Sequence, residues 1–214
     1  MRDNSLSIAL LLLFFACLVG QVFAGWTNEN HDLSEHRQAL LTLPAYLTSG
    51  AFLSALFENW ESEFLQMSAY VILTAYLYQR GSPESRDPDN PKPDPLDHDG
   101  RPDAPWPVRQ GGLVARLYAH SLGLALLGLF VFSFVMHWLN SAREAAQVAL
   151  EHGAPPPSAL EHLTSAQFWF ESFQNWQSEF LSTAVLVLLA IWLRERGSPE
   201  SKPVAAPHAM TGTD

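Results

Sequence analysis

The sequence predicts an all-α integral membrane protein, a four-helix bundle made of two parallel two-helix repeats related by a pseudo-two-fold axis. Three observations lead there: the composition, an internal repeat and four apolar segments. Of 214 residues, 48% are hydrophobic, only 16% are charged and 7 are tryptophan, which is typical of a small membrane bundle. The net charge of −10 argues against nucleic acid as a partner.

The repeat has a constant offset of 116 residues. Residues 57–86 recur as residues 173–202, with 16 of 30 positions identical, and residues 5–19 match residues 121–135 at 8 of 15 positions. The intervening stretch, residues 20–56, matches at only 5 of 37 positions. A period of this length predicts two structurally equivalent halves.

The first helix of each half is strongly apolar. Residues 6–24 carry no charge over 19 positions and residues 117–142 carry none over 26, and a helix needs about 20 residues to cross the hydrocarbon core. We therefore predict transmembrane helices at about 5–24 and 117–140. The first also resembles a secretory signal cleaved after Ala24, but its repeat counterpart lies mid-chain, so we expect a retained helix.

The second helix of each half is expected from about residue 50 to 80 and from 166 to 196, with transmembrane parts at about 57–80 and 173–196 and amphipathic outer starts. Glycine followed by proline is a common helix stop, and such stops recur at Gly81, Pro83, Gly197 and Pro199. The predicted organisation is repeat 1 (1–86), a Pro/Asp-rich cytoplasmic linker (87–112), repeat 2 (113–202) and a flexible C-terminal tail (203–214).

The orientation follows from the lysines and arginines. With four spans, ten of these residues fall on the side of both termini and only two, Arg37 and Arg143, on the other. Because positive charge favours the cytoplasmic side, both termini are expected to be cytoplasmic. Each repeat has an even number of spans, so the halves are expected to be parallel.

Four polar residues form the candidate intramembrane site. Glu63 and Glu179 recur at the repeat offset and lie 17 residues from Arg80 and Arg196, about 25 Å along a helix. Gln21 and His137 should lie at a similar depth, so Gln21, Glu63, His137 and Glu179 could meet around the pseudo-axis. Ionisable groups there suggest a proton or cation site. The alternative is that they accept hydrogen bonds from neighbouring helices and fix the packing.

Two further features have two interpretations each. The Glu-His pairs at Glu35-His36 and Glu151-His152 could be halves of a metal site, or simply belong to two solvated outer loops. The segments RGSPESR and RGSPESK, which we call the RGSPES turns (80–86 and 196–202), could dock the cytoplasmic ends if Glu84 and Glu200 pair with Arg80 and Arg196. Recent duplication would equally explain them.

The two blocks NWxSEFL and RGSPES, at residues 59–65 with 81–85 and again in the second copy, carry a resemblance. The chain resembles a family of small bacterial inner-membrane proteins known only as a domain of unknown function, over residues 5–202. The second copy departs mildly, with Gln177 where the first has Glu61. The resemblance implies four spans and a bacterial membrane, and implies no activity.

No catalytic, cofactor-binding or metal-binding motif stands out in the helices, so no enzyme, cofactor or bound metal is expected. We expect a multi-pass protein of the bacterial inner (cytoplasmic) membrane with a non-enzymatic structural, envelope or partner-binding role. Its partners would be the lipid bilayer and either another protein or a second copy of itself. The alternative is a small proton- or cation-coupled transporter or channel.

Overall fold

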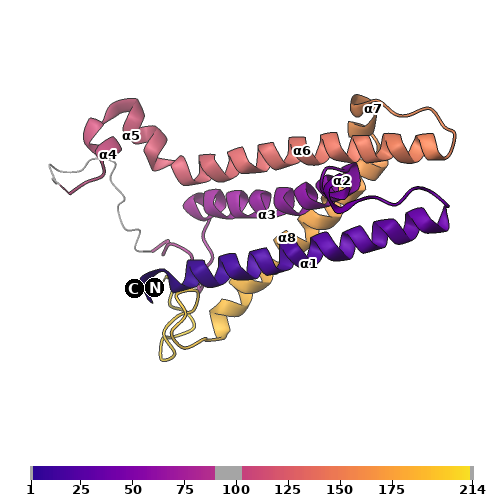
Figure 1. The fold of residues 1–214 in the computed structure, drawn as a ribbon. Helices are drawn as coiled ribbons and strands as arrows, with labels where there is room; N and C mark the ends of the chain where they lie inside the picture. The colour runs from indigo at the N-terminus through magenta and orange to yellow at the C-terminus, as the bar shows by residue number, and fades with distance from the viewer. Residues whose placement is uncertain (1, 90–102, 213–214) are drawn as a thin grey trace. The chain divides into compact units, whose positions relative to one another are not determined.

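The computed structural model describes residues 2–89 and 103–212, so residues 90–102 of the predicted linker lie outside it. Every regular element in this part of the chain is helical (Figure 1). The elements are listed in chain order: η1 (Arg2–Asn4), α1 (Ser5–Glu35), α2 (Leu43–Leu47), α3 (Gly50–Tyr76), α4 (Trp106–Gln110), α5 (Gly112–Ala119), α6 (Ser121–Glu151), α7 (Ala159–Leu163) and α8 (Ala166–Trp192).

The helices match each other at the repeat offset. α6 begins and ends 116 residues after α1, α7 after α2, and α8 after α3. The match includes α2 and α7, which lie in the stretch where the two copies share little sequence. Each is a short helix capped by a hydroxyl group, from Thr42 in α2 and from Ser158 in α7.

Among the described residues, two helices are long and apolar enough to cross a membrane, namely α1 and α6. Both are 31 residues long and continue well past the apolar runs that predict them, because the polar residues that follow, such as Asn28 to Glu35 in α1, are still helical. The helices α3 and α8 have 27 residues each and begin at Gly50 and Ala166, as predicted.

The helices α3 and α8 end at Tyr76 and Trp192, four residues before the predicted ends at Arg80 and Arg196. The reason is a side chain that captures the backbone. Ser85 Oγ accepts the Gln79 N–H at 2.8 Å, and Ser201 Oγ accepts the Glu195 N–H at 2.9 Å. These N–H groups would otherwise continue the helical ladder, so the chain leaves the helix one turn early.

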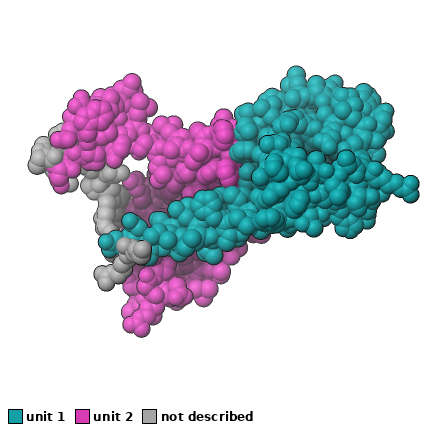
Figure 2. Space-filling model, viewed as in Figure 1, with its two compact units in different colours: residues 1–57, 135–168 teal, residues 58–134, 169–214 magenta. Residues whose placement is uncertain are grey.

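The described chain divides into two compact units, coloured separately in Figure 2. Unit 1 comprises Met1–Phe57 and Val135–Phe168, and unit 2 comprises Glu58–Phe134 and Trp169–Asp214. The helices α3, α6 and α8 each contribute residues to both units.

In unit 1, side chains of the long helices hold the segments that follow them. Trp26 Nε1 donates to the Leu41 carbonyl at 2.7 Å, and Asn30 forms two bonds with the backbone of Leu41. On the other side of the repeat, Trp138 Nε1 donates to the Ala159 carbonyl at 2.7 Å. Buried N–H groups are thereby satisfied, which fixes the path of each loop.

A close helix contact completes unit 1. A Cβ atom on Gly50 would lie 2.8 Å from the Glu144 nitrogen and 3.0 Å from the Asn140 oxygen. The start of α3 therefore approaches the backbone of α6 at a distance that only glycine permits.

In unit 2, polar side chains link α3 to α8. Gln66 donates to Thr183, the fully buried Glu61 accepts the Trp176 indole N–H at 2.8 Å, and Asn175 donates to Glu58. An aromatic cluster lies beside these bonds, with ring centroids 5.4 to 6.2 Å apart among Trp169, Phe173, Trp176 and Phe130. Hydrogen bonds between apolar helices of this kind fix their register.

Candidate functional site

The two predicted glutamates lie together in unit 2. Glu63 on α3 is exposed and Glu179 on α8 is half-buried, and they are close enough for their charges to interact. Neither is the glutamate that takes the tryptophan indole. That residue is Glu61, whose repeat counterpart is Gln177 and which a search for repeated acids therefore misses.

The other two predicted residues belong to unit 1. Gln21 is half-buried on α1, and His137 on α6 is fully buried, with its ring centroid 4.9 Å from that of Phe168. Because the four residues are divided between the two units, their meeting around a common axis stays a prediction.

Unit 1 contains an acidic cavity of about 530 Å³ at the polar ends of α1 and α6. Four carboxylates line it, from Glu29, Asp32, Glu144 and Glu151, together with His36 and His152. Each histidine places Nδ1 2.8 Å from the backbone oxygen four residues earlier, Asp32 for His36 and Val148 for His152. Three members of the two predicted Glu-His pairs thus line one cavity, and Glu35 is the member that does not.

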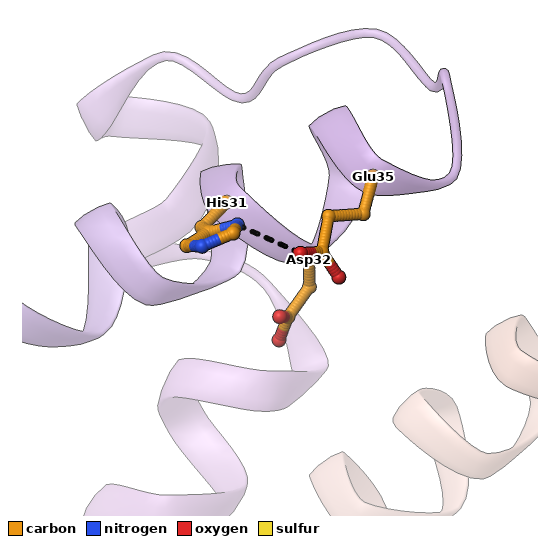
Figure 3. Close-up of side chains that lie close together, drawn as sticks. All are labelled: His31, Asp32 and Glu35. Carbon is orange, nitrogen blue, oxygen red and sulfur yellow. Dashed lines mark ion pairs between the residues drawn. The ribbon is translucent and has the colours of Figure 1, made fainter.

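Glu35 lies instead with His31 and Asp32 on the last turns of α1 (Figure 3). One potential ligand atom from each residue lies within 4.8 Å of the others, and His31 Nδ1 is 3.6 Å from Glu35 Oε1. All three side chains are exposed. A histidine at i with acids at i+1 and i+4 follows from ordinary helix spacing, so this group is an ion pair on a polar helix end.

The two RGSPES turns in unit 2 have the same local structure. Gly81 and Gly197 both adopt the left-handed conformation, with φ of 83° and 88°. The pattern of hydroxyl bonds recurs in full: Ser82 and Ser198 accept the N–H groups of Glu84 and Glu200, while Ser85 and Ser201 accept those of Gln79 and Glu195. The predicted stops at Gly81, Pro83, Gly197 and Pro199 therefore sit within matched turns directly after α3 and α8.

The pairing expected within these turns is different in the structure. Arg80 forms a bidentate pair with Asp89, at 2.5 and 3.0 Å, and the carboxyl group of Glu84 hydrogen-bonds to that of Glu200. Partial burial, then this hydrogen bond and the charge of Glu200, raise the pKa of Glu84 to about 7. The acids of the two turns thus pair with each other.

The C-terminal tail connects the two turns. The buried Lys202 ammonium donates to the carbonyls of His208 and Met210, at 2.8 and 3.1 Å. Farther along, Thr211 Oγ1 accepts the Gly81 N–H at 2.9 Å, and the Gly212 N–H donates to the Ser82 carbonyl at 2.9 Å. Residues 203–212, which the sequence predicts to be flexible, make these bonds in the structure.

Comparison with known proteins gives a family and no activity. No curated protein and no solved structure matches the chain. The model of one family, described as "Domain of unknown function (DUF6766)", matches residues 1–213. Since this match covers nearly the whole sequence, the chain belongs to the DUF6766 family.

Proposed function

We propose that the protein is a multi-pass protein of the bacterial inner membrane with a non-enzymatic structural, envelope or partner-binding role. The observation that carries the proposal is the apolar surface of α1 and α6. In α1, Leu6, Leu12 and Leu13 are 63 to 70% exposed, and in α6, Leu122 is 61% exposed. Large contiguous apolar surfaces are rare on water-soluble monomers, and a bilayer would cover these.

The remaining two spans of the proposal are α3 and α8. Their 27 residues each correspond to about 40 Å of helix, which exceeds the roughly 30 Å of a hydrocarbon core. The polar groups between them are engaged in the bonds from Gln66, Asn175 and Trp176. Such bonds support a packing role for the polar residues within the spans, and hence a structural function.

Membrane extraction and reporter fusions test this proposal. We expect the protein to stay in the membrane pellet after alkaline carbonate treatment. A reporter fused at the C-terminus should read as cytoplasmic, and one inserted at residues 38–40 should read as external. Release by carbonate would refute membrane integration. A C-terminal reporter that reads as external would refute the orientation while leaving integration intact.

A second function, a proton- or cation-coupled transporter or channel, is supported by the approach of Glu63 and Glu179. A cation that binds the folded state raises its melting temperature. The test compares wild type, Glu63→Gln/Glu179→Gln and the control Glu195→Gln, an exposed acid outside the helices, across pH and a panel of cations. A shift lost only in the double variant supports the site. Equal shifts in all three proteins contradict it.

A further inference from the structure

The two RGSPES turns present one carboxyl group each from equivalent positions. In both turns the glycine reverses the chain, and a serine hydroxyl accepts the glutamate's own N–H, at 3.3 Å for Glu84 and 3.2 Å for Glu200. Both backbones are thus fixed by matched bonds. Tail residues also hold the first turn through Gly81 and Ser82.

The meeting of Glu84 and Glu200 requires a proton. Two ionised carboxylates are acceptors only, and they repel at hydrogen-bond distance. The Glu84 Oε2 atom is buried, and no N–H or hydroxyl group in the described part of the chain donates to it. A proton carried by one of the two carboxyl groups supplies the missing donor, so the observed hydrogen bond between them is the neutral-plus-charged form.

The nearby cations are occupied elsewhere. On the first turn, Arg80 is paired with Asp89, and the charge of Asp87 also acts on Arg80. On the second, Lys202 donates to tail carbonyls, and Arg194 donates to backbone carbonyls that include Ala206 of the tail. The tail's own titratable group, His208, has Nδ1 3.3 Å from the Ile191 oxygen. Glu200 is the charged group whose field reaches Glu84 most strongly.

Apolar surroundings add to the cost of a second negative charge. Glu84 lines a cavity of about 240 Å³ together with Leu73, Leu77 and Val187. Tyr70 also lines it, and its buried hydroxyl has no hydrogen-bond partner within the described residues. A carboxylate beside such a surface loses hydration, which favours its protonated form.

We propose that Glu84 and Glu200 form a proton-binding site, in which one proton shared by the two carboxyl groups holds the two RGSPES turns together. When the proton leaves, two like charges face each other across the turns and loosen this end of unit 2. The site stands on contacts within unit 2 alone, so it does not depend on the membrane location or on the Glu63/Glu179 hypothesis.

The direction of the pH effect follows from linkage. The pKa of Glu84 is about 7 in the folded protein against an ordinary value of 4.5, so between these values the folded state binds more protons than the unfolded state. Stability from this site is therefore present at low pH and falls as pH rises, and it is lost above about pH 7.

The experiment measures melting temperature from about pH 5 to about pH 8.5 for full-length protein in detergent. The variants are Glu84→Gln and the control Glu195→Gln, which removes an exposed acid from the same region. An amide donates to Glu200 at every pH, so Glu84→Gln should melt above wild type at the alkaline end by about 3 °C or more and should lose part of the pH slope. Glu195→Gln should retain the wild-type slope.

Infrared spectroscopy of the wild type, with glutamate carboxyl groups isotopically labelled, gives a direct readout. We expect a protonated carboxyl band at about pH 6 that disappears above about pH 8 and is absent from Glu84→Gln. Should Glu84→Gln fail to fold, Glu200→Gln, at the exposed partner, replaces it. The absence of the band in wild type, or equal slopes in Glu84→Gln and Glu195→Gln, would overturn the proposal.

Discussion

Gly81 and Gly197 occupy equivalent positions in the two repeats but have different surroundings. Both have positive φ, yet a Cβ atom at Gly81 would lie 2.9 Å from the His208 oxygen and from Ile191 Cγ2, whereas one at Gly197 would have nothing within 4 Å. The left-handed conformation alone costs an L-residue about 1–2 kcal/mol. We expect Gly197→Ala to lose about this much stability and Gly81→Ala to lose clearly more.

Thermal unfolding of the two variants in detergent measures this difference. Because both substitutions carry the same conformational cost, each controls for the other and the excess isolates the contact with the tail. A melting temperature that falls equally in both variants would mean that the tail does not lie against Gly81.

Ser85 and Ser201 make a second matched pair. Each hydroxyl accepts an N–H that has left the helix, and a typical hydrogen bond contributes about 1 kcal/mol. We predict that Ser85→Ala and Ser201→Ala each lower the melting temperature, and that Ser182→Ala, which removes an exposed hydroxyl bonded only within its own helix, does not. Loss of stability in all three variants alike would rule out a special role for the turns.

Single residues also show what repetition in a sequence can reveal. Repetition identifies Glu63 and Glu179, because both copies carry an acid at that position. A hydrogen bond between α3 and α8 needs a donor on one helix and an acceptor on the other, so the residues that form it differ between the copies. Glu61 with Trp176 and Glu58 with Asn175 are such pairs, and comparison of the copies cannot find them.

At the scale of elements, the sequence predicts starts better than ends. The starts at Gly50 and Ala166 are confirmed. The ends are four residues early because two serines that follow the helix in sequence compete for its backbone, a contact that helix-stop rules for glycine and proline do not include. The short helix α7 has a signal that could have been used, since Ser158 and Glu161 form a capping box.

The crossing of α3 and α6 yields a prediction at this scale. Gly50 starts α3 where its repeat counterpart, Ala166, starts α8. Alanine favours a helix over glycine by about 1 kcal/mol, but at residue 50 its Cβ would press on the α6 backbone at Glu144 and Asn140. We therefore expect Gly50→Ala to lower the melting temperature despite the gain in helix propensity.

Ala166→Gly is the matched comparison for this crossing. It should cost no more than about 1 kcal/mol, which is the propensity difference alone. A higher melting temperature for Gly50→Ala would show that the two helices are farther apart than the structure places them.

For the molecule as a whole, the main question is whether α1 stays in the mature protein. The structure draws α1 as one continuous helix from Ser5 to Glu35, so cleavage after Ala24 would cut it in the middle. Trp26 and Asn30, just beyond that point, hold Leu41 in unit 1. The matching helix α6 has the same length and lies mid-chain, where no signal peptidase acts. We predict that the mature protein retains residues 5–24.

Topology reporters do not answer this question, because a cleaved signal and a retained first span both place Gly25 outside and the C-terminus inside. Intact-mass and N-terminal peptide analysis of protein purified from membranes does. Peptides that cover residues 5–24 would establish the retained helix and leave two equal pairs of long helices, as the matched bounds of α1 with α6 and α3 with α8 imply. An N-terminus at Gly25 would leave α6 without a counterpart in the membrane, and the parallel four-helix arrangement would have to be abandoned.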